Sequence, residues 1–438
     1  MSFFRQSSWM MLCNTLAGVL MFGVHILAPS MLVQAGEYGL FIALLGVLNV
    51  MMSFTPGIQT VFTYEAVAAG DGEARQNLVR YAMGVIKVTT WFWVMLVVLI
   101  MLWRKQVMSF YKMEEPWALG ITLVAGLLQL WLPVAMGMLQ GFQRFSWLGW
   151  ALLTNGGGRL LAAVTFVALL GGAASSAMLG ALTGVAFACF VSLIPLRFLL
   201  ETRGGRHLQW MPWIRRMLPL AFAPVVFQLM MSADLVFFRS ILNLEESDFY
   251  GIAGTLGRGL VMLLGPLAGV MFPKLIQSNR DGKANVLLWN TLLGTLVIGG
   301  LVCLFFVGLA WGWPNVVNAL KESSGNGAAG GFIARVLAKE QGLGFAMDLL
   351  PWFAAGMLCL CFSNVLLSNL LAYQQYRVLA IPFIIVLGYV ICLATLPQNG
   401  KHLVQLIFLF NLLLMVVLMG LVFWTGTWRG ASSQAMDR

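Results

Sequence analysis

The chain is dominated by apolar runs of about 20 residues that recur from one end of the sequence to the other. A membrane-spanning helix needs roughly 20 consecutive, mostly apolar residues. Twelve runs meet this requirement and are predicted to span a membrane, near 10–33, 38–62, 82–103, 117–139, 147–170, 177–200, 217–242, 249–273, 286–311, 346–371, 378–396 and 403–425. We therefore expect an all-α polytopic membrane protein with about twelve transmembrane helices.

The composition leaves little material for a soluble surface. Only 10% of the 438 residues are charged and 60% are hydrophobic, whereas a soluble domain usually carries about a quarter charged residues. The first apolar run is too long for the core of a signal peptide, so we expect it to be retained as the first span. All six cysteines lie within apolar runs, and Cys359 and Cys361 lack the spacing of zinc ligands. We expect small buried hydrophobic side chains at these positions, no metal site and no cofactor.

The basic residues give the chain an orientation. An even number of spans puts both termini on one side, and most of the 26 Lys and Arg residues fall in the loops and tails of that side. Basic loops stay in the cytoplasm, so we expect a multi-pass protein of the cell inner membrane with both termini cytoplasmic. The net charge of +10 is then a topology signal. It forms no basic patch on a soluble surface, and we expect no nucleic-acid partner.

The two halves of the sequence resemble each other. "AGEYGLF" (35–41) opens the second span and "SDFYGIA" (247–253) opens the eighth, while "LQGFQRF" (139–145) matches "AYQQYRV" (372–378). We predict an N-terminal lobe at 1–200 (spans one to six), a cytoplasmic linker at 201–216 and a C-terminal lobe at 217–438 (spans seven to twelve). Parallel repeats of this kind place the substrate path at the interface between the halves.

The C-terminal lobe carries a predicted periplasmic insertion at 312–345. Its "SSGNGAAGG" core has the composition of a flexible linker, and "FIARVLAKE" is expected to form a short helix. A functional loop and a tolerated insertion both remain open.

Several polar and charged side chains fall inside the predicted spans. Asp234 and Arg258 lie roughly 12 Å below the outer boundary at about 1.5 Å per residue, and Arg159 lies near the midplane. Charges at such depth are costly and mark functional positions. The candidate substrate-contacting and cavity-lining residues are Arg159, Arg258, Asp234, His25, Asn49, Asn155 and Asn364.

Structural alternatives stay open for these residues. Asp234 and Arg258, on adjacent spans at equal depth, could form a structural ion pair or a gate that parts on opening. His25 could be a hydrogen-bonded interior histidine, and the asparagines could join helices. Arg239, only three residues from the end of its span, is expected to reach the lipid headgroups.

Catalytic motifs are absent from the sequence. No phosphate-binding GxxxxGK[ST] loop occurs, no paired carboxylates share a helix face, and no soluble segment is large enough to house an active site. We therefore do not expect an enzyme, and a membrane glycosyltransferase or polymerase is disfavoured for lack of a catalytic loop.

Three stretches together resemble a known family. Residues 36–66, the "LQGFQRF" turn and the segment 232–274 are similar to the polysaccharide-exporter (Wzx-type flippase) branch of the multidrug/oligosaccharidyl-lipid/polysaccharide (MOP) superfamily. The shared features are a G-x-Y-G-like start of span two, a Q-G or Y-Q turn after spans four and ten, and an aspartate in span seven. The similarity extends over nearly the whole chain.

The resemblance implies two six-helix lobes arranged in a V around a central cavity, as in MATE/MOP transporters, and alternating access. The implied cargo is a polyprenyl-diphosphate-linked oligosaccharide, moved from the inner to the outer leaflet during polysaccharide biosynthesis for the cell envelope. A coupling cation (H⁺ or Na⁺), membrane lipids and a glycan polymerase or export machinery are the implied partners. The lack of arginine in span one argues against lipid II as the cargo. A cation-coupled exporter of drugs or other small molecules and a non-transporting scaffold of a glycan assembly complex remain as alternatives.

Overall fold

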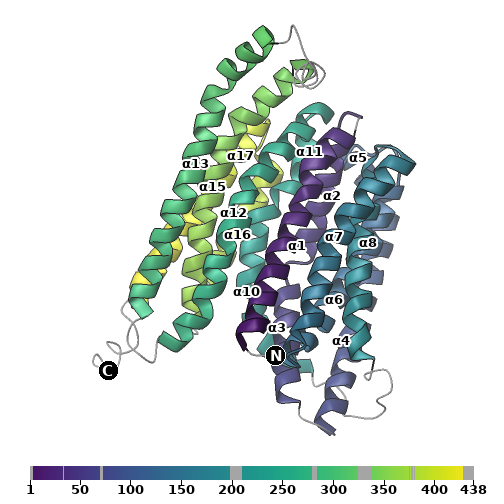
Figure 1. The fold of residues 1–438 in the computed structure, drawn as a ribbon, viewed down its shortest axis with the longest axis vertical. Coiled ribbons are helices and arrows are strands. Elements are labelled where there is room, and N and C mark those ends of the chain that lie inside the picture. The colour runs from purple at the N-terminus through teal and green to yellow at the C-terminus, as the bar shows by residue number, and fades with distance from the viewer. Residues whose placement is uncertain are drawn as a thin grey trace. The chain divides into compact units, whose positions relative to one another are not determined.

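The computed structural model describes residues 3–32, 34–69, 73–197, 210–278, 284–323, 337–373, 375, 378 and 380–427. Over these residues the chain is all-α, as predicted, and contains no strand (Figure 1). Nine of the described helices are long and apolar enough to cross a membrane, and one bent pair of helices is long and apolar enough when its two members are taken together. Together with one 35-residue helix at Leu244–Ser278 and one short apolar helix at Ala380–Thr395, these elements coincide with the twelve predicted spans.

The chain divides into two compact units, Met1–Val225 and Val226–Arg438, which we call unit 1 and unit 2. Each is described by itself. Of the predicted linker 201–216, residues 201–209 lie outside the described part of the chain. Residues 210–216 are not a linker but the first turns of helix α10 (Trp210–Ser232), because the apolar segment that follows continues the same helix. The predicted lobe boundaries themselves stay a prediction.

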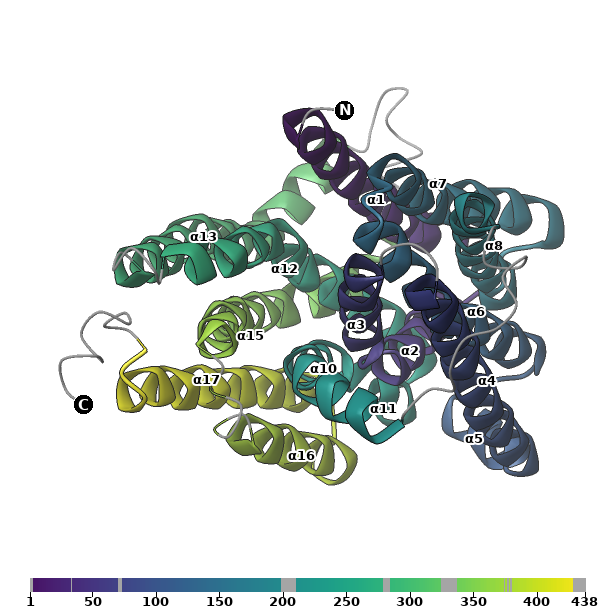
Figure 2. The ribbon, with the colours of Figure 1, turned by 90° about the horizontal axis from the view of Figure 1, so that it is seen from below.

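Unit 1 is a bundle in which α7 lies between α1 and α8, while α6 packs against α8 and α3 (Figure 2). Its helices are α1 (Phe3–Met31), α2 (Glu37–Met51), α3 (Thr55–Ala68), α4 (Glu73–Leu102), α5 (Arg104–Phe110), α6 (Trp117–Gly141), α7 (Phe145–Leu170), α8 (Ala174–Leu193), the short 3-10 helix η1 (Ile194–Leu196) and the first part of α10. Its buried core is built where α3, α6 and α8 meet, around side chains such as Ile58, Phe62 and Leu139.

Glycines bring the helices of unit 1 into backbone contact. A Cβ atom on Gly184 of α8 would lie 2.5 Å from the carbonyl oxygen of Asn155 and 2.8 Å from the nitrogen of Arg159, both on α7. A Cβ atom on Gly156 of α7 would lie 2.6 Å from the carbonyl oxygen of Ala17 on α1. Small residues serve this purpose in membrane helices, since lipid provides no hydrophobic drive for helix association. The close packing of α7 holds Asn155 and Arg159 in fixed positions.

The second predicted span is not one straight helix. Helices α2 and α3 meet at a break of three residues and are bent by 45°. Pro56 lies in the first turn of α3, where its missing N–H and its ring prevent the preceding helix from continuing. The Met52 carbonyl oxygen at the break accepts hydrogen bonds from both the backbone N–H (3.0 Å) and the side-chain hydroxyl (2.7 Å) of Thr55.

In unit 2, α15 packs against α12, α13 and α17, and α16 packs against α17 (Figure 2). Its helices are α11 (Asp234–Ile241), α12 (Leu244–Ser278), α13 (Ala284–Ser323), α15 (Glu340–Ala372), α16 (Ala380–Thr395) and α17 (Gly400–Trp424), together with the last residues of α10. Because α15 contacts three helices, its buried face supplies much of the unit's core, including Phe353 and Leu360, each with an exposure of 0%.

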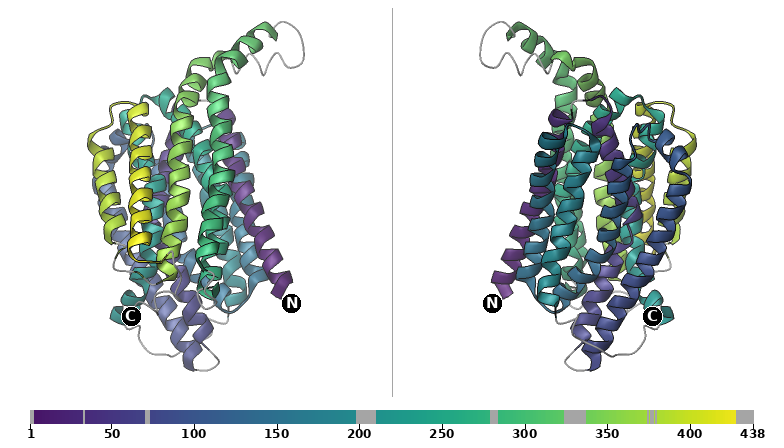
Figure 3. Two further views of the ribbon diagram at one scale, coloured as in Figure 1. Left: turned by 90° about the vertical axis from the view of Figure 1, so that its left-hand side faces the viewer. Right: turned by 90° about the vertical axis from the view of Figure 1, so that its right-hand side faces the viewer.

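The predicted insertion 312–345 is more helical than its composition suggests. Helix α13 continues to Ser323 and is 40 residues long, about 60 Å at 1.5 Å per residue, which exceeds the roughly 30 Å of a bilayer core. Helix α15 begins at Glu340, where the carboxylate accepts a hydrogen bond from the Lys321 ammonium (2.9 Å). The two helices therefore extend together beyond α16 and α17 (Figure 3). The Gly-Ser core, and all but the end of the predicted short helix, lie outside the described residues.

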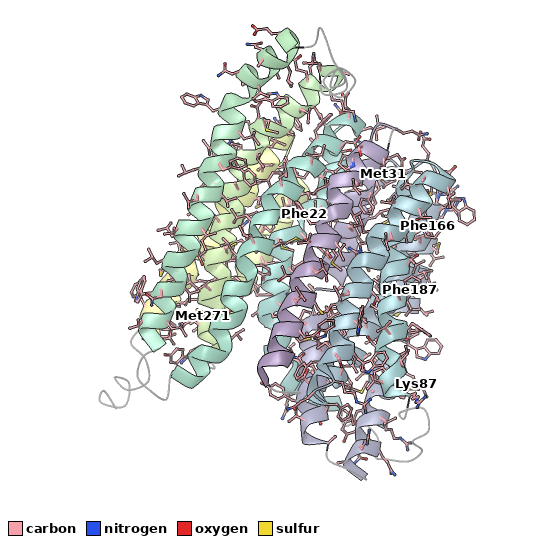
Figure 4. All side chains as sticks on the ribbon, in the orientation of Figure 1. Phe22, Met31, Lys87, Phe166, Phe187 and Met271 are labelled. Atoms are coloured by element: carbon pink, nitrogen blue, oxygen red, sulfur yellow. The ribbon has the colours of Figure 1, made fainter. Side chains whose placement is uncertain are left out.

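Apolar side chains cover the outer faces of the helices (Figure 4). Phe187 on α8 is 53% exposed and Trp311 on α13 is 89% exposed. An exposed apolar surface of this extent indicates contact with lipid. The chain is a multi-pass membrane protein.

Candidate functional site

Asp234 and Arg258, two charged side chains of unit 2, meet at one point. Nη2 of Arg258 (α12) donates to Oδ1 and Oδ2 of Asp234 (α11), at 2.7 and 2.5 Å. The Asp234 side chain is fully buried and that of Arg258 is 11% exposed. The ion pair expected from matching depth is therefore present. Both helices belong to unit 2, so movement between the units does not require the pair to part.

Arg258 also reaches the point where span seven is interrupted. Helix α10 ends at Ser232 and α11 begins at Asp234, with a turn at Ala233. The Arg258 Nε–H donates to the Met231 carbonyl oxygen (2.8 Å), just before this turn. A carbonyl released by a helix break in a membrane must find another donor. Arg258 supplies that donor and neutralises the carboxylate three residues further on.

Aromatic rings and glycines hold the pair in place. The Tyr250 hydroxyl donates to Asp234 Oδ2 (2.7 Å), and the Tyr250 ring stacks on Phe238 with centroids 4.8 Å apart. The Arg258 guanidinium carbon lies 5.4 Å from the centroid of the Phe353 ring, within the range of a cation–π contact. A Cβ atom on Gly254 would come within 2.5 Å of Arg258 Nη1, so the guanidinium lies along the glycine face of α12.

Arg239 is not the headgroup anchor that its sequence position suggests. The residue is 2% exposed, and its Nη1 donates to the Ser247 hydroxyl at the start of α12 (3.4 Å). Sequence distance from the end of a span gives depth, whereas the direction of the side chain depends on the rotation of the helix. Here that rotation turns Arg239 inward, in the last turn of α11, where a cation is favourable.

In unit 1, Asn155 and Arg159 lie one turn apart on α7, as their spacing predicts. Both are half-buried. Asn155 Oδ1 and Arg159 Nε are themselves buried, and neither has a hydrogen-bond partner among the described residues. Leaving a buried polar atom unpaired costs about 1–3 kcal/mol. One acceptor and one charged donor are thus available here to a polar or anionic group.

The remaining candidates are dispersed. His25 is half-buried on α1, with its ring 6.0 Å from that of Phe41 on α2. Asn49 is exposed near the end of α2, and Asn364 is half-buried on α15 in unit 2. The roles of these three residues stay predictions.

The sequence did not point to four groups that complete these arrangements. Tyr250 was recognised only as part of a repeated motif, although a tyrosine in an apolar run has a polar tip that needs a partner. Met231 contributes a backbone oxygen, which no side-chain pattern reveals. Tyr389 on α16 is fully buried, and its hydroxyl has no hydrogen-bond partner within the described part of the chain. Glu37 at the start of α2 accepts a hydrogen bond from the Ala174 N–H at the start of α8 (2.5 Å).

Comparison with known proteins places this arrangement in a recognised architecture. No protein-family model matches the chain, and no curated protein matches it. Among solved structures, the lipid II flippase MurJ in an inward closed conformation is similar, with a TM-score of 0.68 and 14% identity over 94% of this chain and 87% of that one. An inward-facing multidrug resistance MATE family transporter of the MOP superfamily gives a TM-score of 0.65 and 12% identity, covering 95% of both chains. An outward-facing MATE transporter gives 0.54 and 12%, covering 93% of both.

The chain has the MATE/MurJ transporter fold. The fold expected from the sequence resemblance is thereby confirmed, while the polysaccharide-exporter branch remains a prediction. An identity of 12–14% extends to the fold alone. The roles of individual side chains in this MATE/MurJ-like chain must therefore be argued from their own contacts.

Proposed function

We propose that the protein is a flippase that moves a polyprenyl-diphosphate-linked oligosaccharide, or a related polysaccharide precursor, from the inner to the outer leaflet by alternating access. The MATE/MurJ fold supports a transporter, and one solved relative with this fold is named as a lipid flippase. The sequence resemblance to polysaccharide exporters supports the glycan cargo.

The balance of buried charge favours an anionic cargo. Asp234 compensates Arg258 within unit 2, and its carboxylate is fully used by Arg258 and Tyr250. In unit 1, the buried Nε of Arg159 has no hydrogen-bond partner among the described residues. This unpaired donor is the observation that carries the proposal. A guanidinium binds phosphate oxygens through several parallel hydrogen bonds, and a diphosphate offers such oxygens.

Asparagine side chains suit the glycan part of the cargo. Asn155 lies one turn from Arg159 and has a buried, unpaired Oδ1 that could accept a hydrogen bond from a sugar hydroxyl. Asn49, His25 and Asn364 are proposed as further contacts along the path. Arg258, whose Nε and Nη2 already serve Met231 and Asp234, is favoured as a structural residue rather than a diphosphate contact.

The test is substitution of Arg159 in a strain that depends on this protein for its surface glycan. We expect Arg159→Ala to reduce surface glycan at least tenfold, since a lost charged contact of about 1.5–3 kcal/mol corresponds to roughly 10- to 100-fold. Arg159→Lys should retain part of the activity, because it keeps the charge and loses the planar donor set. Arg104→Ala, which removes an exposed basic residue of α5, is the matched control. Wild-type glycan in Arg159→Ala cells with normal protein in the membrane would refute the assignment.

A cation-coupled exporter of drugs or small molecules is the second candidate, because one inward-facing MATE transporter fits the fold nearly as well as MurJ (TM-scores 0.65 and 0.68). Deletion of the gene separates the two. A flippase predicts loss of surface glycan with unchanged drug tolerance, and an exporter predicts the reverse.

The proposed setting is the cell inner membrane, with cytoplasmic termini and a glycan polymerase or export machinery as partner. Reporter fusions at the C-terminus, active only on one side of the membrane, test this orientation. A reporter that is active only outside the cytoplasm would reverse it.

A further inference from the structure

The carboxylate of Asp234 sits in a shell of oxygen atoms at the interruption of span seven. The Met231 carbonyl oxygen accepts a hydrogen bond from the Arg258 guanidinium, and the Tyr250 hydroxyl donates one to the Asp234 carboxylate. A carboxylate, a free carbonyl and hydroxyl groups are the ligands that hard cations take in proteins. The shell therefore has the chemistry of a monovalent-cation site.

The cation in this shell is already part of the chain. The Arg258 guanidinium donates to both carboxylate oxygens and to the Met231 carbonyl, and its side chain is only 11% exposed. Phe353 covers one face of the guanidinium, and Gly254 leaves room for Nη1 against the helix. A buried carboxylate requires one compensating positive charge, and Arg258 provides it without leaving space or charge for a second.

We propose that Arg258 is a tethered resident cation, which takes the place of a free monovalent cation at Asp234. Transport by this protein is then not coupled to an alkali cation bound at span seven. The oxygen shell accepts a free cation such as Na⁺ only after the guanidinium has been removed. The inference concerns unit 2 alone and does not depend on which cargo is moved.

The experiment is a Na⁺ titration of the purified full-length protein, in which the thermal unfolding midpoint is measured at each Na⁺ concentration. The pH and the ionic strength are held constant, with choline as the replacement cation. We expect the wild-type midpoint to be insensitive to Na⁺. Arg258→Gln, which keeps a donor for the Met231 carbonyl, should gain Na⁺-dependent stabilisation, with a rise of about 3 °C at ~100-fold excess over Kd. The double variant Asp234→Asn/Arg258→Gln should lose this response.

Two results overturn the proposal. One is stabilisation of the wild type by Na⁺ that Asp234→Asn abolishes, since the site would then accept a free cation with Arg258 in place. The other is a folded Arg258→Gln protein that does not respond to Na⁺, which would leave Arg258 as a structural partner only. The wild-type titration is informative even if Arg258→Gln fails to fold, because the first result needs no Arg258 variant. Loss or retention of glycan transport in Arg159 variants has no bearing on either outcome.

Discussion

Removal of one partner of the Asp234–Arg258 pair is expected to be the most costly single charge change in unit 2. Asp234→Asn keeps the size of the side chain and an acceptor for Tyr250, but it leaves the Arg258 guanidinium buried without a counter-charge. Breaking a buried pair in this way costs about 3–5 kcal/mol. Arg258→Gln should cost at least as much, because it leaves the Asp234 carboxylate buried without a counter-charge and also loses the cation–π contact with Phe353, which contributes about 0.5–2 kcal/mol.

The double variant separates pairing from the other contributions. In Asp234→Asn/Arg258→Gln neither position carries a charge, so the loss should be smaller than the sum of the two single losses. We expect a coupling energy of about 2–3 kcal/mol, near the upper end for contacting residues. The measurement is reversible unfolding in mixed micelles, followed by tryptophan fluorescence. Asp348→Asn, an exposed carboxylate on α15 of the same unit, is the control and should change stability by less than about 0.5 kcal/mol. Additive single losses would refute the argument, because they would show that the two charges do not compensate each other.

Two further predictions concern packing in unit 1. Gly184→Ala should destabilise the protein by about 1–3 kcal/mol, since its Cβ would meet backbone atoms of α7, including the carbonyl oxygen of Asn155. The control Gly120→Ala, with no atom within 4 Å of its Cβ, should be nearly neutral. Thermal unfolding of both variants tests this prediction, and equal midpoints would contradict the close contact. Glu37→Ala should lower the free energy of unfolding by about 1 kcal/mol, because it removes the acceptor of the Ala174 N–H and a negative charge at the start of α8. Glu37→Gln, which keeps an acceptor, should lower it less. Hydrogen exchange at the Ala174 amide should become faster in Glu37→Ala, and unchanged exchange would show that Glu37 does not cap α8.

Much of the candidate site followed from simple positions along the spans. Depth arithmetic placed Asp234 and Arg258 at the same level on adjacent helices, and the ion pair is present. Helical spacing likewise put Asn155 and Arg159 on one face of α7. These predictions succeeded because depth and facing within one helix depend only on rise and rotation per residue.

The same arithmetic misplaced Arg239 and overlooked Tyr250. Arg239 was assigned to the headgroups from its distance to the end of the span, yet the packing of α11 against its neighbours buries it. Tyr250 belongs to the same structure but has no charge that would single it out. The burial of Arg239 and the hydrogen bond of Tyr250 both depend on which neighbouring helix the side chain contacts. That contact is set by two helices together and cannot be derived from one of them alone.

The sequence by itself determined the all-α membrane architecture, because apolar runs of about 20 residues match the thickness of a bilayer. Only the tertiary structure decided how the buried charges are used. Arg258 is saturated by Asp234 and a backbone carbonyl, whereas Arg159 keeps an unpaired donor. That difference arises from the rotation of each helix about its axis and from the neighbouring helices that it contacts. Both are determined by contacts between segments that lie far apart in the sequence.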